Sequence, residues 1–90
     1  MRFTSIVLNK QESRSFLADR VRWGIIGTGE IAVTFTEGIR NSRTGTVVGI
    51  GSRTQATAEA FGATHGIPRR YGSYENLLSD PEIDAVYVAS

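Results

Sequence analysis

The chain has 90 residues, 40% of them hydrophobic and 21% charged, a composition typical of one small globular domain and not of a disordered or membrane protein. Its formal net charge is only +1, and residues 21–90 hold six arginines against seven acids, so no basic face for a nucleic acid is expected. The absence of cysteine excludes disulfides and thiolate metal sites, and no apolar run approaches the ~18 residues of a membrane span. We therefore expect a cytoplasmic protein without nucleic-acid, membrane or metal partners.

Residues 1–20 show neither a helical nor a strand-like period, and a polar run separates their two small apolar groups. The first of these groups, residues 5–8, is too short for the core of a signal peptide. We interpret residues 1–20 as an N-terminal extension that is mobile or loosely docked. A transit peptide is the alternative, and Glu12 and Asp19 count against it.

The domain itself is predicted to occupy residues 21–90, and it opens with a compact apolar run at residues 21–26. This run ends in glycine and is typical of a strand buried on both faces of a parallel sheet. A helical pattern follows, in which apolar residues recur every four positions, at Ile31, Phe35 and Ile39, with Ala32 beside them. We expect this stripe of the helix to face the sheet.

A second strand is predicted at residues 46–51, which are rich in β-branched side chains. Residues 21–51 thus form a strand–helix–strand unit of the usual ~30 residues, a crossover that is almost always right-handed and parallel. The next helix is capped by Ser52 or Thr54 and ends at His65-Gly66. Its inward residues are expected to be Ala56, Ala60 and Phe61.

The remaining elements are a short strand at residues 67–71, a short helix capped by Ser73, and an apolar strand at residues 83–89. Together the elements predict an α/β fold: a partial Rossmann-type parallel sheet of four strands with helices on both faces and no substrate domain. In the Rossmann strand order 3-2-1-4-5-6 the fourth strand is internal. Its outer edge would then lack a partner, so we expect a marginally stable or self-associating chain.

The turn after the first strand carries the sequence Gly-Thr-Gly-Glu-Ile-Ala at residues 27–32, a Gly-x-Gly-x-x-Ala motif. In a dinucleotide-binding turn the first glycine permits the tight bend, the second lets a pyrophosphate approach the backbone, and the alanine lets the helix lie close to the strand. The phosphates are held by the free amides of the helix start. The predicted site residues are Gly27, Thr28, Gly29, Glu30 and Ile31, with the side chain of Glu30 in solvent. The alternative is a turn that binds nothing.

The end of the second strand indicates which dinucleotide fits. An NAD-type site places a carboxylate there for the ribose hydroxyls, but no Asp or Glu occurs between Glu37 and Glu59. Ser52 and Arg53 stand there instead, and a hydroxyl with a guanidinium suits a 2′-phosphate. We therefore expect NADP(H) in preference to NAD(H). An ordinary solvated arginine is the alternative interpretation of Arg53.

Residues able to catalyse a reaction are scarce. The only lysine, Lys10, precedes the fold, and the only histidine, His65, falls at the sheet edge opposite the cofactor crevice. The three tyrosines, at positions 71, 74 and 87, are interpreted as packing residues. No acid–base pair is left to move the proton that accompanies a hydride, so we predict no catalytic residue in this chain.

Three passages together resemble the N-terminal half of the glucose-fructose oxidoreductase, inositol dehydrogenase and MocA family (Gfo/Idh/MocA). They are residues 21–32, residues 48–53 with the alanine-rich helix after them, and residues 71–89. The last is the most specific, because its pattern Tyr-x-x-Tyr-Glu-x-Leu-Leu-x-Asp-Pro-x-Ile-Asp-x-Val-Tyr is not a generic Rossmann feature. Residues 1–20 fall outside the resemblance.

The resemblance implies an NAD(P)-binding Rossmann domain, followed in full-length members by an α/β domain that holds a small sugar-like, cyclitol or diol substrate. Members oxidise or reduce hydroxyl and carbonyl groups by hydride transfer, and Ser52-Arg53 is similar to the family's NADP-preferring variant. The family's Pro-Asn-x-x-His loop and Glu-Lys-Pro motif, which supplies the catalytic lysine, do not occur in residues 1–90. Association into a homo-oligomer is left open.

Three hypotheses follow. The favoured one is an oxidoreductase fragment, a nucleotide-binding half without its substrate domain and catalytic residues. The second is a non-enzymatic module that senses NADP(H) and reports it to a partner, and the third is an inactive truncated product.

Overall fold

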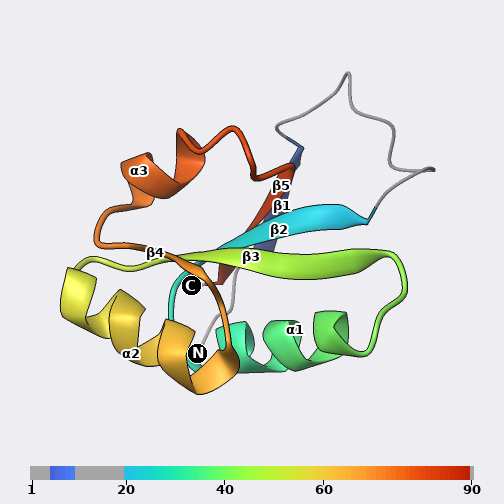
Figure 1. Cartoon of the computed structure of the whole chain (residues 1–90), viewed down its shortest axis with the longest axis horizontal. Helices are drawn as coiled ribbons and strands as arrows, with labels where there is room; N and C mark the ends of the chain where they lie inside the picture. The colour runs from blue at the N-terminus through green and yellow to red at the C-terminus, as the bar shows by residue number, and fades with distance from the viewer. Residues whose placement is uncertain (1–4, 10–19, 90) are drawn as a thin grey trace.

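The computed structural model describes residues 5–9 and 20–89, which form a single sheet with helices on both faces (Figure 1). The strands in chain order are β1 (Ser5–Asn9), β2 (Val21–Ile26), β3 (Gly45–Gly51), β4 (Arg69–Tyr71) and β5 (Ala85–Ala89). The helices are α1 (Glu30–Arg40), α2 (Gln55–His65) and α3 (Tyr74–Leu78). Across the sheet the strands lie in the order β1-β5-β2-β3-β4.

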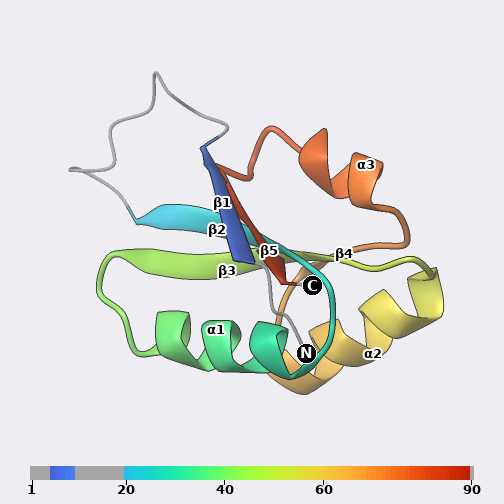
Figure 2. The same ribbon diagram turned by 180° about the vertical axis from the view of Figure 1, so that it is seen from behind.

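The four strands β5, β2, β3 and β4 are parallel to one another, as the sequence predicted. Helices α1 and α2 lie on one face of the sheet and α3 on the other (Figures 1 and 2). The chain moves outward from β2 through β3 to β4 and then returns to the other side of β2 as β5. The strand order therefore reverses between β2 and β5, which makes the carboxyl ends of these two strands the topological switch point.

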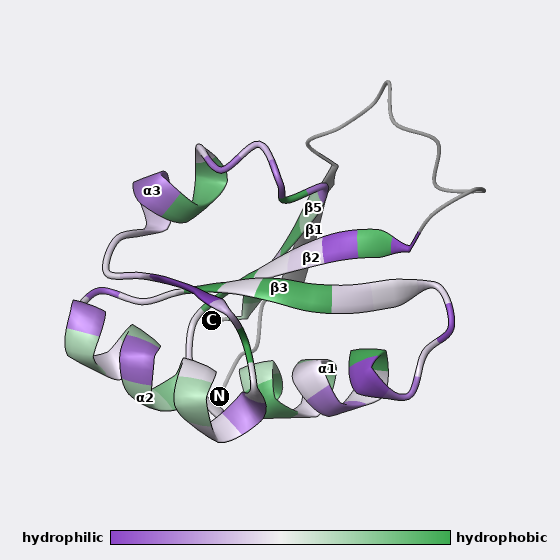
Figure 3. Cartoon of the chain, viewed as in Figure 1, coloured by the Kyte–Doolittle hydropathy of each residue, from purple (hydrophilic) through white to green (hydrophobic). Residues whose placement is uncertain are grey.

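Each face of the sheet covers its own hydrophobic core. Beneath α1 and α2 the buried residues are Ile25, Ala32, Ile50, Ala58, Phe61, Ile67 and Ala89. Beneath α3 they are Ile26, Leu77, Ile83 and Val86. Consecutive strand residues such as Ile25 and Ile26 enter opposite cores, which explains the continuous apolar runs of strands covered on both faces. Figure 3 shows apolar colour along the strands and polar colour on many loops and outer helix turns.

Short polar residues and glycine set the ends of α2 and α3 where the sequence predicted them. Thr54 caps α2 by accepting a hydrogen bond from the Thr57 amide, at 3.2 Å. Gly66 ends α2 in the left-handed conformation, with φ 69°. Ser73 caps α3 in the same way as Thr54 caps α2.

The inward faces of the two long helices match the prediction in part. In α1 Ala32 is buried and Ile31 and Phe35 are half-buried against the core, as expected, while the buried Thr36 was not predicted. In α2 the buried residues are Ala58, Phe61 and Gly62, and the two alanines expected inside, Ala56 and Ala60, are exposed. Small residues lie where a helix comes closest to the sheet. Because alanines occur on several faces of α2, the sequence pattern could not show which of them point inward.

The N-terminal segment corrects one expectation. The sequence assigned no element to residues 1–20, yet Ser5–Asn9 pairs antiparallel with β5, in register from Ser5 opposite Ala89 to Asn9 opposite Ala85 (Figure 2). The edge of β5 that was expected to lack a partner is thus covered, which removes the stated reason for self-association. Residues 10–19, the rest of the proposed extension, lie outside the described part of the chain.

At the amino ends of β2 and β5, a closed set of hydrogen bonds joins the two strands. The fully buried carboxylate of Asp84 accepts from the Arg22 amide at 2.8 Å, from Nε at 3.1 Å and from Nη2 at 2.9 Å. The Asp84 amide donates to the Arg22 carbonyl at 2.8 Å, and Arg22 Nη1 donates to Glu82 at 2.6 Å. These bonds place β5 beside β2 and so fix the position of the switch point.

Candidate functional site

The glycine turn connects β2 to α1 at the carboxyl edge of the sheet. Gly27 has φ 110°, a conformation that L side chains rarely adopt, and its amide donates to the Gly51 carbonyl at 3.0 Å. A Cβ at this position would collide with the carbonyl oxygen of Ala89, the last residue of β5. Gly27 is therefore required for the tight bend and also for the close approach of β5.

The second glycine leaves the start of α1 open. Gly29 is the N-cap of α1, with no side-chain capping bond, and a Cβ there would have no heavy atom within 4 Å. The first intrahelical bond runs from the Val33 amide to the Gly29 carbonyl, at 3.1 Å. The amides before Val33 in the first turn have no intrahelical acceptor, and they lie at the positive end of the helix dipole. The side chain of Glu30 is exposed, as expected.

The second predicted group lies at the end of β3. Ser52 is buried, and its amide donates to the Tyr71 carbonyl of β4 at 3.0 Å. Arg53 is exposed, and within residues 5–9 and 20–89 its side chain has no hydrogen-bond or ion-pair partner. A guanidinium without a protein partner, next to a strand end, is available to an anion.

The two groups are neighbours, because β2 and β3 pair in parallel with Ile26 opposite Gly51. The bend at Gly27 is bonded to Gly51, and Ser52 follows directly. Ala89 ends β5 on the other side of Gly27. The glycine turn and the Ser52–Arg53 turn therefore share the carboxyl edge at the switch point, where doubly wound sheets bind ligands. The open α1 terminus suits a pyrophosphate, and the guanidinium suits a further phosphate.

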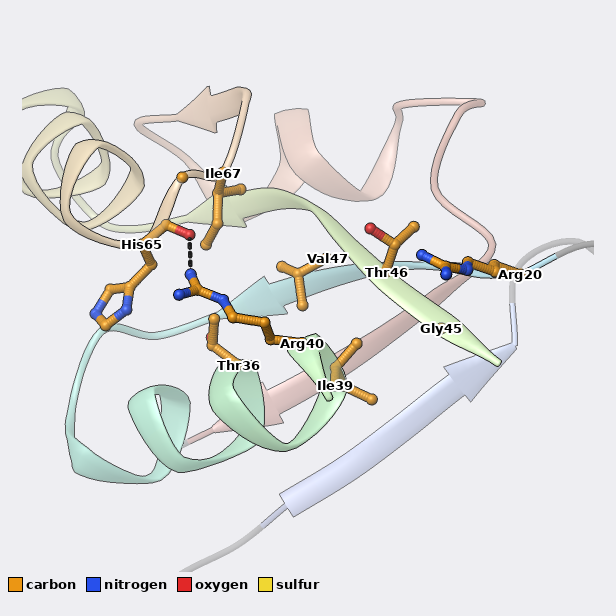
Figure 4. A pocket seen from close by; sticks show the side chains of 10 residues that line it. Arg20, Thr36, Ile39, Arg40, Gly45, Thr46, Val47, His65 and Ile67 are labelled. Atoms are coloured by element: carbon orange, nitrogen blue, oxygen red, sulfur yellow. Dashed lines mark hydrogen bonds between the residues drawn. The ribbon is translucent and has the colours of Figure 1, made fainter. Parts of the chain in front are cut away.

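His65 borders two cavities. It ends α2 and lines a cavity of about 240 Å³ together with Gly45 and Thr46, at the amino end of β3 (Figure 4). Figure 4 shows Arg40 reaching across this cavity, and its Nη2 donates to the His65 carbonyl at 2.7 Å. Arg40 thereby supplies a hydrogen bond and a positive charge to the carboxyl end of α2.

A second cavity, of about 280 Å³, lies between α1 and α2, and Thr28 of the glycine turn borders it. Most of its other lining comes from α2, including Thr57, Phe61 and His65. His65 thus lines a cavity that the glycine turn also borders, which the sequence interpretation did not expect. Among the residues that the structure describes, no helix is long and apolar enough to cross a membrane. The same residues hold no group of three His, Cys, Asp or Glu side chains that could ligate a metal.

One polar cluster was missed by the sequence interpretation, which treated Tyr71 as a packing residue. The Tyr71 hydroxyl donates to the buried carboxylate of Asp80, which also accepts from Arg69 at 2.9 Å and from the Glu82 amide at 2.8 Å. Burial raises the pKa of Asp80, but these hydrogen bonds outweigh it and hold the pKa below its ordinary value. Burial and the bond to Asp80 raise the pKa of Tyr71. The cluster ties β4 to the loop before β5.

The parallel sheet, the switch point and the glycine turn define a dinucleotide-binding Rossmann domain. The chain belongs to the Gfo/Idh/MocA oxidoreductase family with an NAD-binding Rossmann fold, whose model matches residues 21–90. The trans-1,2-dihydrobenzene-1,2-diol dehydrogenase of Danio rerio is 46% identical over 72 residues, which are 78% of this chain and 22% of the relative. An uncharacterized oxidoreductase of Rhizobium meliloti is 49% identical over 71 residues, covering 78% of this chain and 21% of the relative.

Solved structures agree with this assignment. A 3-ketoreductase from Actinomadura kijaniata, solved as a variant with TDP-benzene and NADP, matches with a TM-score of 0.72 and 30% identity, over 78% of this chain and 22% of the other. An NAD-binding oxidoreductase from Klebsiella pneumoniae matches with a TM-score of 0.64 and 25% identity, over 72% of this chain and 19% of the other. The chain therefore spans about a fifth of the length of the relatives it matches.

Proposed function

We propose that the chain is the NADP(H)-preferring nucleotide-binding part of an oxidoreductase that acts on a hydroxyl or carbonyl group of a sugar, cyclitol or diol by hydride transfer. The observation that carries the NADP(H) preference is the exposed Arg53 guanidinium, which has no partner among the described residues and follows the end of β3, the strand paired with β2 at the glycine turn. The diol dehydrogenases and the 3-ketoreductase among the relatives support the substrate class.

Within the proposed site each group has one role. The amides of Gly29, Glu30 and Ile31 hold the pyrophosphate, while Gly27 and Thr28 form the bend that leaves them accessible. Ser52 and Arg53 hold the 2′-phosphate of the adenosine ribose, which NADP(H) carries and NAD(H) lacks. Bound NADP(H) supplies the hydride donor or acceptor.

The proposal assigns no catalytic residue to this chain. The ring of His65 packs against Phe61, and the Tyr71 hydroxyl is engaged with Asp80. We place the groups that bind substrate and transfer protons in the part of the relatives' length that this chain does not span. The chain then binds cofactor but does not turn over substrate alone.

The test compares the affinities of NADPH and NADH for the wild-type chain, for Arg53→Ala and for a matched control, Arg43→Ala. Arg43 is another exposed arginine, in the turn before β3 at the opposite edge. Losing a charge-assisted contact of about 1.5–3 kcal/mol should weaken NADPH binding by roughly tenfold or more in Arg53→Ala and leave NADH binding unchanged. An NADPH-to-NADH affinity ratio equal in all three proteins would contradict the proposal.

A further inference from the structure

Contacts from β4 and the loop after it hold the Ser52–Arg53 turn in place. We infer that Gln55 and Gly72, which hold this turn against β4, position the Arg53 guanidinium for the 2′-phosphate and so help to set the NADP(H) preference. We call their contacts with β4 and with each other the clamp. The inference rests on the proposed function, because it concerns how that same arginine is aimed.

The residues on both sides of Arg53 are bonded to β4, one through its backbone and the other through its side chain. On one side the Ser52 amide donates to the Tyr71 carbonyl at 3.0 Å. On the other side Gln55, the first residue of α2, donates through Nε2 to the Arg70 carbonyl at 2.9 Å. Two consecutive carbonyls of one strand thus anchor a span of only four residues, with Arg53 inside it.

Gly72 makes the close approach of the two segments feasible. A Cβ at Gly72 would lie 2.7 Å from the Gln55 amide nitrogen and 2.9 Å from its Cα, closer than real Cβ atoms approach other atoms. Gly27 and Gly66 are the glycines with positive φ among the described residues, so Gly72 is needed for space and not for an unusual conformation. Any side chain at this position must push the start of α2 away from β4.

The clamp bears on recognition because the Arg53 side chain has no contact of its own to orient it. Since it lacks hydrogen-bond and ion-pair partners among the described residues, the backbone that carries it sets the point from which its guanidinium must reach the phosphate. A planar guanidinium binds a phosphate through two parallel hydrogen bonds, a geometry that tolerates little displacement. A shift of this backbone should therefore weaken NADPH binding and leave NADH binding unchanged.

The anchoring strand is itself fixed from the other side. Tyr71, which accepts the Ser52 amide through its carbonyl, donates through its hydroxyl to the buried Asp80. Asp80 also accepts from Arg69, the first residue of β4. The polar cluster that the sequence interpretation missed thus supports the strand that holds the Ser52–Arg53 turn.

The test uses Gly72→Ala and Gln55→Ala in the whole chain, with Ser73→Ala as the matched control. Ser73 adjoins Gly72, but its hydroxyl caps α3 through the Asn76 amide at 3.1 Å, so its loss destabilises the same loop without a new side chain against α2. Affinities for NADPH and NADH are measured on each folded variant. Gln55→Ala removes the anchor without adding bulk, so the test remains decisive if Gly72→Ala does not fold.

The inference predicts that the NADPH-to-NADH affinity ratio falls about fivefold in Gly72→Ala and in Gln55→Ala, and stays within about twofold of wild type in Ser73→Ala. If Arg53→Ala lowers the ratio but the two clamp variants match Ser73→Ala, the inference is wrong and the proposed function stands. If Arg53→Ala leaves the ratio unchanged, or if the wild-type chain binds neither nucleotide, the proposed function fails and the inference fails with it.

Discussion

The two edges of the parallel sheet are built in opposite ways. At the amino edge two arginines are bonded within the chain: Arg22 to Asp84 and Glu82, and Arg40 to the carboxyl end of α2, while Arg43 is exposed. At the carboxyl edge the first turn of α1 has no side-chain cap, and Arg53 has no partner among the described residues. The capped starts of α2 and α3 show that this sequence supplies side-chain caps elsewhere.

The difference separates stability from recognition. Polar groups that are hydrogen-bonded within the chain hold strands together, because an unpaired polar group in a buried place raises the free energy of the folded state. Polar groups that are left open at a strand end remain available to a ligand. Mutations at the amino edge should therefore change the free energy of unfolding, and mutations at the carboxyl edge should change the affinity for NADPH.

The largest effect is expected at the amino edge, from Asp84→Ala. The variant leaves the half-buried Arg22 side chain and its amide without their buried acceptor, so the free energy of unfolding in urea should fall by about 3–5 kcal/mol. The control is Glu82→Ala, which removes the exposed acceptor of the same arginine and should cost under about 1 kcal/mol. Equal losses in the two variants would show that burial does not decide the strength of this network.

The two glycines of the turn should separate folding from binding. In Gly27→Ala the strained φ alone costs about 1–3 kcal/mol, and the collision with the Ala89 carbonyl adds to it. Gly29→Ala has ordinary dihedral angles and open space, so stability should change by less than about 0.5 kcal/mol. Its methyl group would lie where the proposed site holds the pyrophosphate, so NADPH affinity should fall at least about tenfold. Full NADPH binding by a folded Gly29→Ala protein would place the phosphates elsewhere.

A smaller effect, dependent on pH, is expected at Asp80. Its pKa is lower in the folded chain than the ~3.9 of an unfolded aspartate, so the ionised form stabilises the fold above that pH. Asp80→Asn should reduce the free energy of unfolding by about 1–3 kcal/mol at pH 7, with the difference from wild type shrinking below about pH 4. The exposed Glu75→Gln serves as control and should show little difference at either pH. A constant Asp80→Asn deficit from pH 7 to pH 3 would contradict the assignment.

Much of the fold could be predicted because its signals are local. The apolar runs gave the parallel strands, and Thr54, Gly66 and Ser73 marked helix ends by chemistry that acts within a few residues. The pairing of β1 with β5 could not be predicted, because it joins segments at opposite ends of the chain. The buried bond between Arg22 and Asp84 spans 62 positions and gives no local sequence pattern.

The location of the candidate site could be predicted from the sequence, but the close contacts around its glycines could not. Topology places the glycine turn and Ser52–Arg53 at one edge, since parallel strands end together. The sequence did not show that Gly27 also packs against the end of β5, or that Gly72 admits the start of α2. Both are close approaches between segments far apart in the sequence. Each depends on which atoms a Cβ at the glycine would meet, and the tertiary fold sets those atoms, so the sequence alone does not show them.

The central claim is that the ligand lies at the open carboxyl edge. The most direct measurement is an NADPH titration of the isotope-labelled chain, followed through backbone amide resonances. The account predicts shifts at Gly29, Glu30 and Ile31 and at Ser52–Arg53, with the amides of Arg40, Gly45 and Thr46 unchanged. Shifts confined to the amino-edge cavity lined by Arg40, Gly45 and Thr46, with the glycine turn unaffected, would contradict it.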